Sequence, residues 1–443
     1  MPIPWNPQES PSDSDEKRWT TSTVMLKTSS IEEKLRSVVG QESLHAATPT
    51  DAVSGVLPQF VVEPGDERQL ALILSFANEA EIAVIPRGGG TKLDWGNPPK
   101  RAEIILSTAR LNRILEHAWA DLTVTVEAGC TLQTLQKTLA QHGQRLAFDG
   151  LRSERATIGG VLSTNDSGVL RLRFGALRDL IIGVTLALPD GTLASSGGKV
   201  VKNVAGYDLP KLATGAFGTL GVITRAVFRL HPLPRSAKTF SFAVEDFQSM
   251  QRHVLAIQDS KLAHTALQIR CAGGAQPHAD ILFEATEAGL SAQELQLRTI
   301  LGSTGAEQSS EDVWNAKQNL WASKEFALIA KVSMLPAEIA KMAAVTEELA
   351  KAQKARWQIV VQASGIGMLR LEGEPAALSA VVEQLRAQLE AGGGSLVILC
   401  RPAGLKSLDA WGTAGDAVSL MRAVKFQLDP KNTLNPLRFV GGI

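Results

Sequence analysis

The sequence predicts an α+β fold, in which a glycine-punctuated N-terminal domain is followed by a ferredoxin-like α+β module. Short apolar strand candidates alternate with amphipathic helix candidates from Pro58 onward. Glycine-rich loops separate these elements as far as Pro234. Beyond Pro234 such loops are fewer, and longer helices stand between paired strands, which is typical of a ferredoxin-like antiparallel sheet.

Length and composition limit the classes of protein that the chain could represent. The 443 residues suggest two to three domains. Lys+Arg and Asp+Glu are both 45, so no overall basic field favours nucleic acid. The three cysteines, Cys130, Cys271 and Cys400, are far apart and form no CxxC pair. We therefore expect no metal site and no iron–sulfur cluster held by this chain alone.

Hydrophobic periodicity places the individual elements in order along the chain. Helices are predicted at 67–80, 131–142, 246–259, 291–301, 336–353 and 375–391, and a weak helical pattern covers 31–39 after a possible N-cap at Ser30. Strands are predicted at 82–86, 103–107, 122–127, near 146, and at 180–188, 220–230, 265–270, 280–284, 357–363, 367–371 and 395–400. No internal repeat is apparent.

These elements suggest four parts. Residues 1–50 are expected to form a largely disordered N-terminal extension, since the first thirty residues are rich in Ser, Thr, Pro and Asp. Residues 51–234 and 235–425 would form the two domains. Residues 426–443 would form a C-terminal tail.

The first candidate binding motif is the run Pro86-Arg87-Gly88-Gly89-Gly90-Thr91-Lys92, directly after a predicted strand. Three consecutive glycines let the backbone approach a ligand closely. Successive N–H groups could then form an anion-binding nest, for which a pyrophosphate is the natural ligand. A plain turn explains the same residues about equally well. The motif is neither a Rossmann fingerprint nor a phosphate-binding P-loop of the GxxxxGK type.

Further glycine-containing motifs follow in a fixed order. They are TIGG at 157–160 with a Ser/Thr/Asn-rich continuation to Gly168, RFGALRD at 173–179, KNVAGYDLPKL at 202–212 and GTLGVIT at 218–224. Apolar residues interleave with the polar ones after Thr157, which indicates a half-buried segment rather than a surface loop. Each motif alone is a weak signal.

Taken together and in this order, the motifs resemble the FAD-binding domains of the vanillyl-alcohol-oxidase, or PCMH-type, family. The KNVAGYD segment narrows the resemblance to the FAD-binding E subunits of glycolate oxidases. The segment 428–436 (LDPKNTLNP) is similar to the family's C-terminal return to the flavin domain. The resemblance extends from about Pro58 to Phe439. It implies a two-subdomain PCMH-type FAD-binding domain at 51–234, an α+β cap domain at 235–425 and a returning tail.

The resemblance also assigns cofactor-binding roles. Residues 86–92 would cradle the FAD pyrophosphate, and Gly221, Val222 and Ile223 would lie along the adenosine or the isoalloxazine edge. The residues expected to follow the ribityl chain and the diphosphate are Thr157, Gly159, Gly160, Ser163, Asn165 and Gly168. Arg178 and Asp179 would brace the fold rather than contact the flavin, and the roles of Lys199, Lys202 and Tyr207 stay open.

The sequence departs from the family in its histidines. The phosphate loop contains no histidine or cysteine, so the resemblance implies non-covalent FAD. None of the seven histidines lies after His278, and the histidine-rich metal site of relatives that oxidise D-2-hydroxy acids is missing. No catalytic residue can be assigned, although a carboxylate such as Glu325 or Glu372 could act as the base. Lys331, Arg370 and Arg401 could bind a carboxylate, although solvated or structural cations are the simpler interpretation. Phe217 also stands where many relatives have Glu or Leu.

The resemblance implies an FAD-binding subunit of a glycolate oxidase complex that oxidises glycolate to glyoxylate. Its partners would be a catalytic flavoprotein subunit and an iron–sulfur subunit, and the chain alone would be inactive. The polar N-terminus and the absence of a long apolar run suggest a cytoplasmic protein, held at the inner face of the membrane only through its complex. Two alternatives stay open: a self-sufficient FAD-linked oxidase of another hydroxy acid or alcohol, and a flavin-free assembly scaffold.

Overall fold

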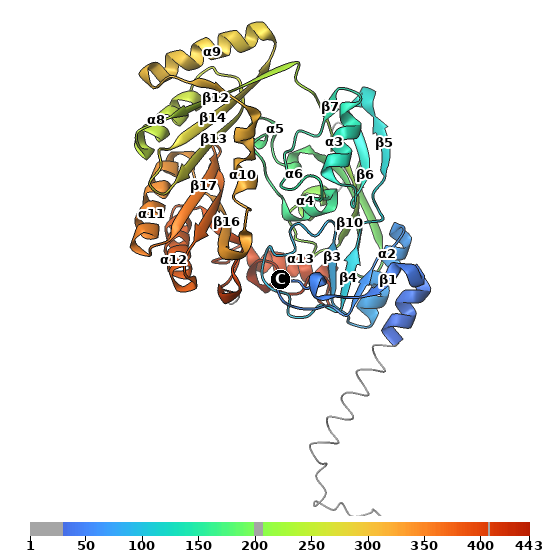
Figure 1. Cartoon of the computed structure of the whole chain (residues 1–443). Coiled ribbons are helices and arrows are strands. Elements are labelled where there is room, and N and C mark those ends of the chain that lie inside the picture. The colour runs from blue at the N-terminus through green and yellow to red at the C-terminus, as the bar shows by residue number, and fades with distance from the viewer. Residues whose placement is uncertain (1–29, 199–206, 406–407) are drawn as a thin grey trace, which may run out of the picture.

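The chain folds into two lobes (Figure 1). A computed structural model describes residues 30–198, 207–405 and 408–443. The N-terminal lobe carries two sheets, and the second lobe, the cap, carries one long antiparallel sheet. Both helices and strands are abundant, so the predicted α+β class is confirmed.

The first sheet of the N-terminal lobe has the strand order β1-β2-β4-β3, in which β2, β4 and β3 are parallel. Asp66 caps the helix α2 by accepting a hydrogen bond from the Gln69 N–H. The apolar face of α2 packs onto this sheet through Leu70, Ile73 and Leu74. The elements are β1 (Leu44–Ala46), β2 (Phe60–Val62), α2 (Glu67–Glu79), β3 (Val84–Arg87) and β4 (Ile104–Ser107).

Residues 30–50 differ from the prediction of a largely disordered extension. Residues 30–39 are helical, and β1 pairs with β2. Leu35 is fully buried and Leu44 nearly so, which explains the order in a segment whose composition is otherwise polar. The rest of the predicted extension, 1–29, lies outside the described residues.

The second sheet of this lobe is antiparallel, with the order β5-β6-β10-β8-β9. Its strands are β5 (Ile114–Ala118), β6 (Thr123–Glu127), β8 (Ile181–Ala187), β9 (Leu193–Gly197) and β10 (Val222–Arg229), and β7 (Gln144–Arg145) pairs separately with β11 (His231–Pro232). Its helices are α3 (Leu132–Ala140), α4 (Ile158–Thr164), α5 (Arg171–Phe174), α6 (Leu177–Leu180) and α7 (Leu209–Ala213).

The cap contains two successive βαββαβ units, which the sequence analysis did not detect as a repeat. The first comprises β12 (Ser236–Ala243), α8 (Phe247–Gln258), β13 (His264–Ala272), β14 (His278–Ala285), α9 (Glu287–Leu301) and β15 (Glu307–Ser309). The second comprises β16 (Ala327–Ser333), α11 (Ile339–Ala352), β17 (Arg356–Gln362), β18 (Ile366–Glu372), α12 (Pro375–Ala391) and β19 (Ser395–Cys400). Each unit has ferredoxin-like strand order, and β13 pairs with β17 to join them into one sheet of order β15-β12-β14-β13-β17-β18-β16-β19.

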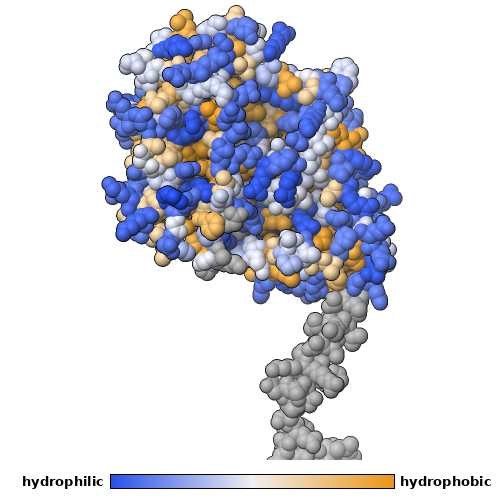
Figure 2. All heavy atoms as spheres, in the orientation of Figure 1, coloured by the Kyte–Doolittle hydropathy of each residue, from blue (hydrophilic) through white to orange (hydrophobic). Residues whose placement is uncertain are grey.

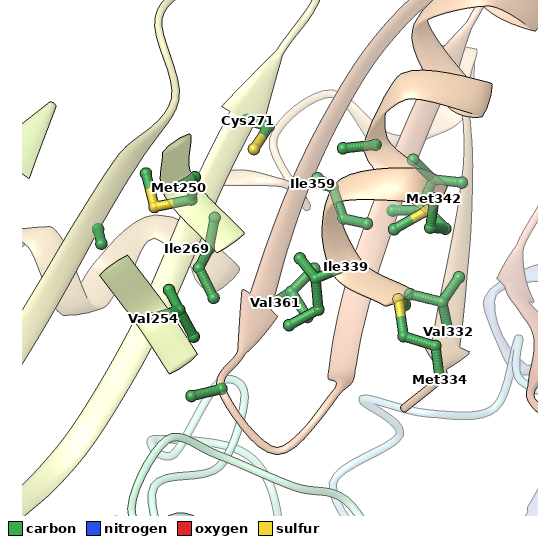
Figure 3. Packing of buried hydrophobic residues seen from close by; sticks show 14 of the residues in the cluster. Met250, Val254, Ile269, Cys271, Val332, Met334, Ile339, Met342, Ile359 and Val361 are labelled. Carbon is green, nitrogen blue, oxygen red and sulfur yellow. The ribbon is translucent and has the colours of Figure 1, made fainter. Parts of the chain in front are cut away.

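The cap core lies between this sheet and its outer helix layer. Figure 3 shows Met250 and Val254 of α8 beside Ile269 of β13, and Ile339 of α11 beside Val361 of β17. Burial of this apolar layer leaves the opposite face of the sheet turned toward the N-terminal lobe, where the short helix α10 (Ala316–Asn319) lies between the lobes (Figure 1). Figure 2 shows that hydrophilic side chains cover much of one face of the molecule, with apolar ones mainly toward its middle.

The C-terminal segment leaves the cap and returns to the first sheet. After α13 (Val418–Leu428), the Val84 N–H donates to the Thr433 carbonyl and the Asn435 N–H donates to the Val84 carbonyl. Through these two hydrogen bonds the tail pairs in parallel with β3, with Leu434 opposite Val84. No helix in the described ranges is long and apolar enough to cross a membrane.

Candidate active site

A cleft of about 690 Å³, open to solvent, lies in the N-terminal lobe where β3 ends. The predicted residues that line it come from three segments far apart in the sequence. All the predicted cofactor-binding residues except Asn165 and Gly168 line it. The lining residues predicted from sequence are Pro86, Arg87, Gly88, Gly89, Gly90, Thr91, Lys92, Thr157, Gly159, Gly160, Ser163, Gly221, Val222 and Ile223.

The glycine triplet is required by close packing as well as by any ligand. A Cβ on Gly88 would lie 2.0 Å from the Thr157 hydroxyl oxygen, and one on Gly89 would lie 1.7 Å from the Arg155 carbonyl oxygen. Gly90 has a φ of 70°, which favours glycine. The loop therefore lies directly against residues 155–157, and no larger side chains fit at its first two glycines.

The polar groups at this contact suit a diphosphate. Within the described part of the chain, the N–H groups of Gly88, Gly89 and Gly90 donate to no protein acceptor. The Thr157 hydroxyl is buried and also lacks a hydrogen-bond partner. A buried donor without a partner is costly, and phosphate oxygens would accept hydrogen bonds from these groups. The residues present therefore fit the diphosphate of FAD.

Arg87 is oriented by a carboxylate outside the cleft. Its Nη1 lies 2.5 Å from Asp51 Oδ1, and both side chains are mostly buried. Burial acts to raise the pKa of Asp51, but hydrogen bonds from Arg87 and Thr48 outweigh burial and hold that pKa at about 2. The ion pair therefore fixes Arg87 at the end of β3, directly before the glycine triplet.

The helix α4 forms a second wall of the cleft. The Gly159 N–H donates to the Ala128 carbonyl, and a Cβ on Gly159 would lie 2.9 Å from the Ala128 Cβ. Ile158, Val161 and Leu162 are buried, which agrees with the half-buried segment inferred from their interleaving. This helix was not predicted, because its two glycines lower helix propensity.

Asn165 and Gly168 do not line the cleft, and each has a structural role. Asn165 ends α4 in the left-handed conformation with a φ of 44°. Gly168 packs so closely that a Cβ would lie 2.1 Å from Asp149, whose carboxylate accepts from the N–H groups of Val169 and Leu170. Arg178 and Asp179 also lie outside the cleft lining, and Asp179 accepts a hydrogen bond from the Ala176 N–H.

Some lining residues were missed by the sequence analysis. They are Leu93, Thr108, Thr164, Phe217, Gly218, Asn435 and Arg438. The tail motif was a signal for Asn435, whose amide donates to the Phe217 carbonyl. Phe217 has a φ of 60° and packs edge-on to Trp411, with the Arg438 guanidinium over its ring. This packing gives a physical role to the aromatic departure noted in the sequence.

A separate cavity of about 440 Å³ lies between the lobes. It is lined by Trp95, Asp166, Ser167, Val169, Lys317, Lys331, Val360, Gln362, Ile366, Gly367, Met368 and Leu399. Asp166 binds Lys317 at 3.1 Å, and Lys92, which lines the first cleft, lies 3.4 Å from the same carboxylate. The two sites are therefore connected through one buried charge cluster.

Lys331 lines this cavity without a direct ion pair, and Asp166 acts on it only through its more distant charge. Among the described residues its ammonium makes no hydrogen bond and no ion pair, and burial lowers its pKa. Ser167 Oγ and Trp95 Nε1 are buried without partners in the same cavity. A small anion could accept hydrogen bonds from these three donors.

The other candidate cations are occupied. The Arg370 guanidinium donates to the Glu372 carboxylate and to the carbonyls of Leu320 and Ala322. Arg401 donates to the carbonyls of Leu408 and Gly96. The structural interpretation of these two arginines therefore fits their contacts. Tyr207 is 90% exposed, and Lys199 and Lys202 lie outside the described residues.

A strong general base is not evident in the interlobe cavity. Its lining includes no histidine and no glutamate within the described ranges. Burial acts to raise the pKa of Asp166, but the charges of Lys317 and Lys92 outweigh burial, so this pKa falls below its ordinary value. Glu372 is paired with Arg370 and Arg356. No group of three or more potential metal ligands occurs in the described part of the chain.

Comparisons with known proteins agree with an FAD site in this cleft. Residues 58–197 match the family model of the FAD binding domain, and residues 412–438 match the C-terminal domain of FAD linked oxidases. The chain therefore carries an FAD binding domain, and FAD is its cofactor.

Individual relatives give a finer picture. The chain is 32% identical to glycolate oxidase subunit GlcD of Bacillus subtilis over 48% of this chain, an alignment that spans only about half, 45%, of that relative. It is 25% identical to D-2-hydroxyglutarate dehydrogenase of Xanthomonas citri pv. viticola over 86% of this chain and 88% of the relative. The solved structure of p-cresol methylhydroxylase shares the fold, with a TM-score of 0.73, 14% identity and coverage of 93% of this chain and 96% of the other.

Proposed function

We propose that this chain is the FAD-binding subunit of a glycolate oxidase complex that oxidises a 2-hydroxy acid, glycolate, to glyoxylate. The observation that carries the proposal is the cleft at the end of β3, with its unpartnered diphosphate donors, connected to an interlobe cavity that holds Lys331. FAD, when bound, supplies the hydride acceptor. The 2-hydroxy acid relatives support the substrate class.

The composition of the cavity supports an accessory role. Oxidising a hydroxy acid requires a group that accepts the hydroxyl proton, and general base catalysis contributes roughly a hundredfold to ten-thousandfold. Asp166 is engaged by two lysines and has a lowered pKa, so it is a poor proton acceptor. A catalytic flavoprotein partner would supply turnover, and an iron–sulfur partner would receive the electrons.

The test is anaerobic mixing of the FAD-loaded chain with excess glycolate, following flavin absorbance at about 450 nm. We expect no rapid bleaching by the isolated chain, and bleaching after the catalytic flavoprotein partner is added. Rapid bleaching by the isolated chain would refute the accessory role.

Lys331 favours a second candidate function, a self-sufficient FAD-linked dehydrogenase of a small 2-hydroxy acid. In that case the protonated Lys331 ammonium would bind the substrate carboxylate, or its neutral amine would accept the hydroxyl proton. Burial lowers the pKa of Lys331, which is the direction that a lysine base requires. Turnover that rises with pH would favour the base, and carboxylate binding that weakens with pH would favour the binding role.

A further inference from the structure

A buried ion pair joins the tail to the wall of the FAD cleft. Lys425 of α13 and Asp429 lie 2.5 Å apart, with 7% and 0% of their side chains exposed. Neither side chain lines the cleft. Their contacts nevertheless reach two segments that do.

The Lys425 ammonium connects these two segments directly. It donates to the Thr219 carbonyl at 2.8 Å and to the Leu434 carbonyl at 2.9 Å, as well as to Asp429. Thr219 belongs to the loop that carries Phe217, Gly218 and Gly221 along the cleft, and Leu434 precedes the lining residue Asn435. All three ammonium donors are used, and two of them bind backbone carbonyls, one in the loop at Thr219 and one in the tail at Leu434.

Asp429 fixes the same tail segment from within. Its carboxylate accepts hydrogen bonds from the Thr433 N–H, the Thr433 hydroxyl and the Leu434 N–H. The turn 429–434 thereby presents Thr433 and Asn435 to Val84, in the strand that leads into the glycine triplet. The pair lies behind the cleft, where the loop 217–221, the tail and β3 meet.

We infer that Lys425 and Asp429 are positioning residues for FAD, and that affinity for the cofactor depends on their ion pair through Thr219 and Leu434. The inference rests on the FAD cleft and does not depend on the substrate. A lysine is suited to this position because its three donors satisfy two carbonyls and one carboxylate. Without it, Asp429 is an unpaired buried charge and the two carbonyls lose their donor.

The experiment compares Asp429→Asn with a matched variant, Asp280→Asn. Asp280 is also 0% exposed and also accepts four hydrogen bonds, two of them from Arg270, but it lies in the cap sheet away from the cleft. FAD dissociation constants would be measured on the folded apoproteins by flavin fluorescence, and thermal unfolding midpoints would be measured on the same samples.

We expect both variants to lower the unfolding midpoint, but only Asp429→Asn to weaken FAD binding, by at least about tenfold. Asp280→Asn should stay within about twofold of wild-type affinity. Wild-type affinity in folded Asp429→Asn, or an equal loss of affinity in Asp280→Asn, would overturn the inference.

A double variant, Lys425→Met with Asp429→Leu, keeps the test decisive if the single variant does not fold. Replacing both charges by apolar groups often restores stability, but it cannot restore the donors to Thr219 and Leu434. Weak FAD binding by the folded double variant supports the inference, and wild-type affinity overturns it. A wild-type chain that binds no FAD would refute the cofactor cleft itself, which is a different result from either.

Discussion

Substitution of Gly89 by alanine tests the phosphate loop most directly, because the structure gives the clash. The new Cβ would lie 1.7 Å from the Arg155 carbonyl oxygen and 2.8 Å from its carbon. Both atoms belong to the backbone, so the loop itself must move by more than about 1 Å to reach an ordinary contact distance. A shift of that size breaks hydrogen bonds whose donor–acceptor distances are about 2.9 Å.

The expected loss can be worked out from those bonds. Each hydrogen bond from a backbone N–H to a charged phosphate contributes about 1.5–3 kcal/mol. Loss of two such bonds weakens FAD binding by about 3 kcal/mol or more, which is roughly a hundredfold in the dissociation constant. Gly89→Asp should weaken it further, because its carboxylate adds a like charge beside the diphosphate.

The assay is titration of the apoprotein with FAD, followed by quenching of flavin fluorescence. Gly415→Ala is the control, since a Cβ at Gly415 meets no atom within 4 Å and its backbone is not in a left-handed conformation. The control should keep wild-type affinity. If Gly89→Ala folds and also binds FAD as the wild type does, the triplet is not the phosphate site.

The remaining predictions concern attachment, substrate and stability. Acid precipitation should release yellow flavin into the supernatant, since no histidine or cysteine lines the described cleft, and flavin retained in the pellet would disprove non-covalent binding. Lys331→Met should weaken glycolate binding to the FAD-loaded chain at least about tenfold. The control Lys351→Met, at an exposed lysine, should leave glycolate binding unchanged. Unchanged binding in Lys331→Met would show that Lys331 is not part of the substrate site. Because burial lowers the pKa of Lys331, wild-type glycolate binding should weaken as pH rises, at values below the 10.5 of an ordinary lysine; binding that is constant up to pH 10.5 would contradict this. Asp51→Asn should cost about 1 kcal/mol of unfolding free energy at neutral pH. The folded pKa of Asp51 lies below its unfolded value of 3.8, so this stabilisation is present above pH 3.8 and is lost as pH falls toward 2; equal acid stability of variant and wild type would argue against it.

Local patterns were sufficient for much of the fold. The predicted strand at 395–400 and helix at 375–391 have the observed bounds, because strong periodicity and clear glycine or proline boundaries define them. The strands β1, β2, β5, β9, β11, β12, β15 and β16 were missed. Several of these are only three to five residues long, and their strand state comes from pairing with distant partners rather than from their own composition.

The two units of the cap likewise could not be predicted from local sequence patterns. Its two βαββαβ units share strand order but no evident sequence repeat. Many apolar side chains can fill equivalent core positions, so the fold persists while the sequence signal disappears.

The sequence by itself determined the α+β class, the glycine triplet and the ordered set of motifs that gave FAD as the expected cofactor. These features depend on backbone freedom and local periodicity, which are legible along the chain. Only the tertiary structure decided that Asn165 and Gly168 lie outside the cleft lining, that Asn435 and Arg438 complete it, and that Lys331 lies between the lobes without a direct ion pair. Those facts depend on which distant segments pack together, and burial and pairing of side chains exist only after the chain has folded.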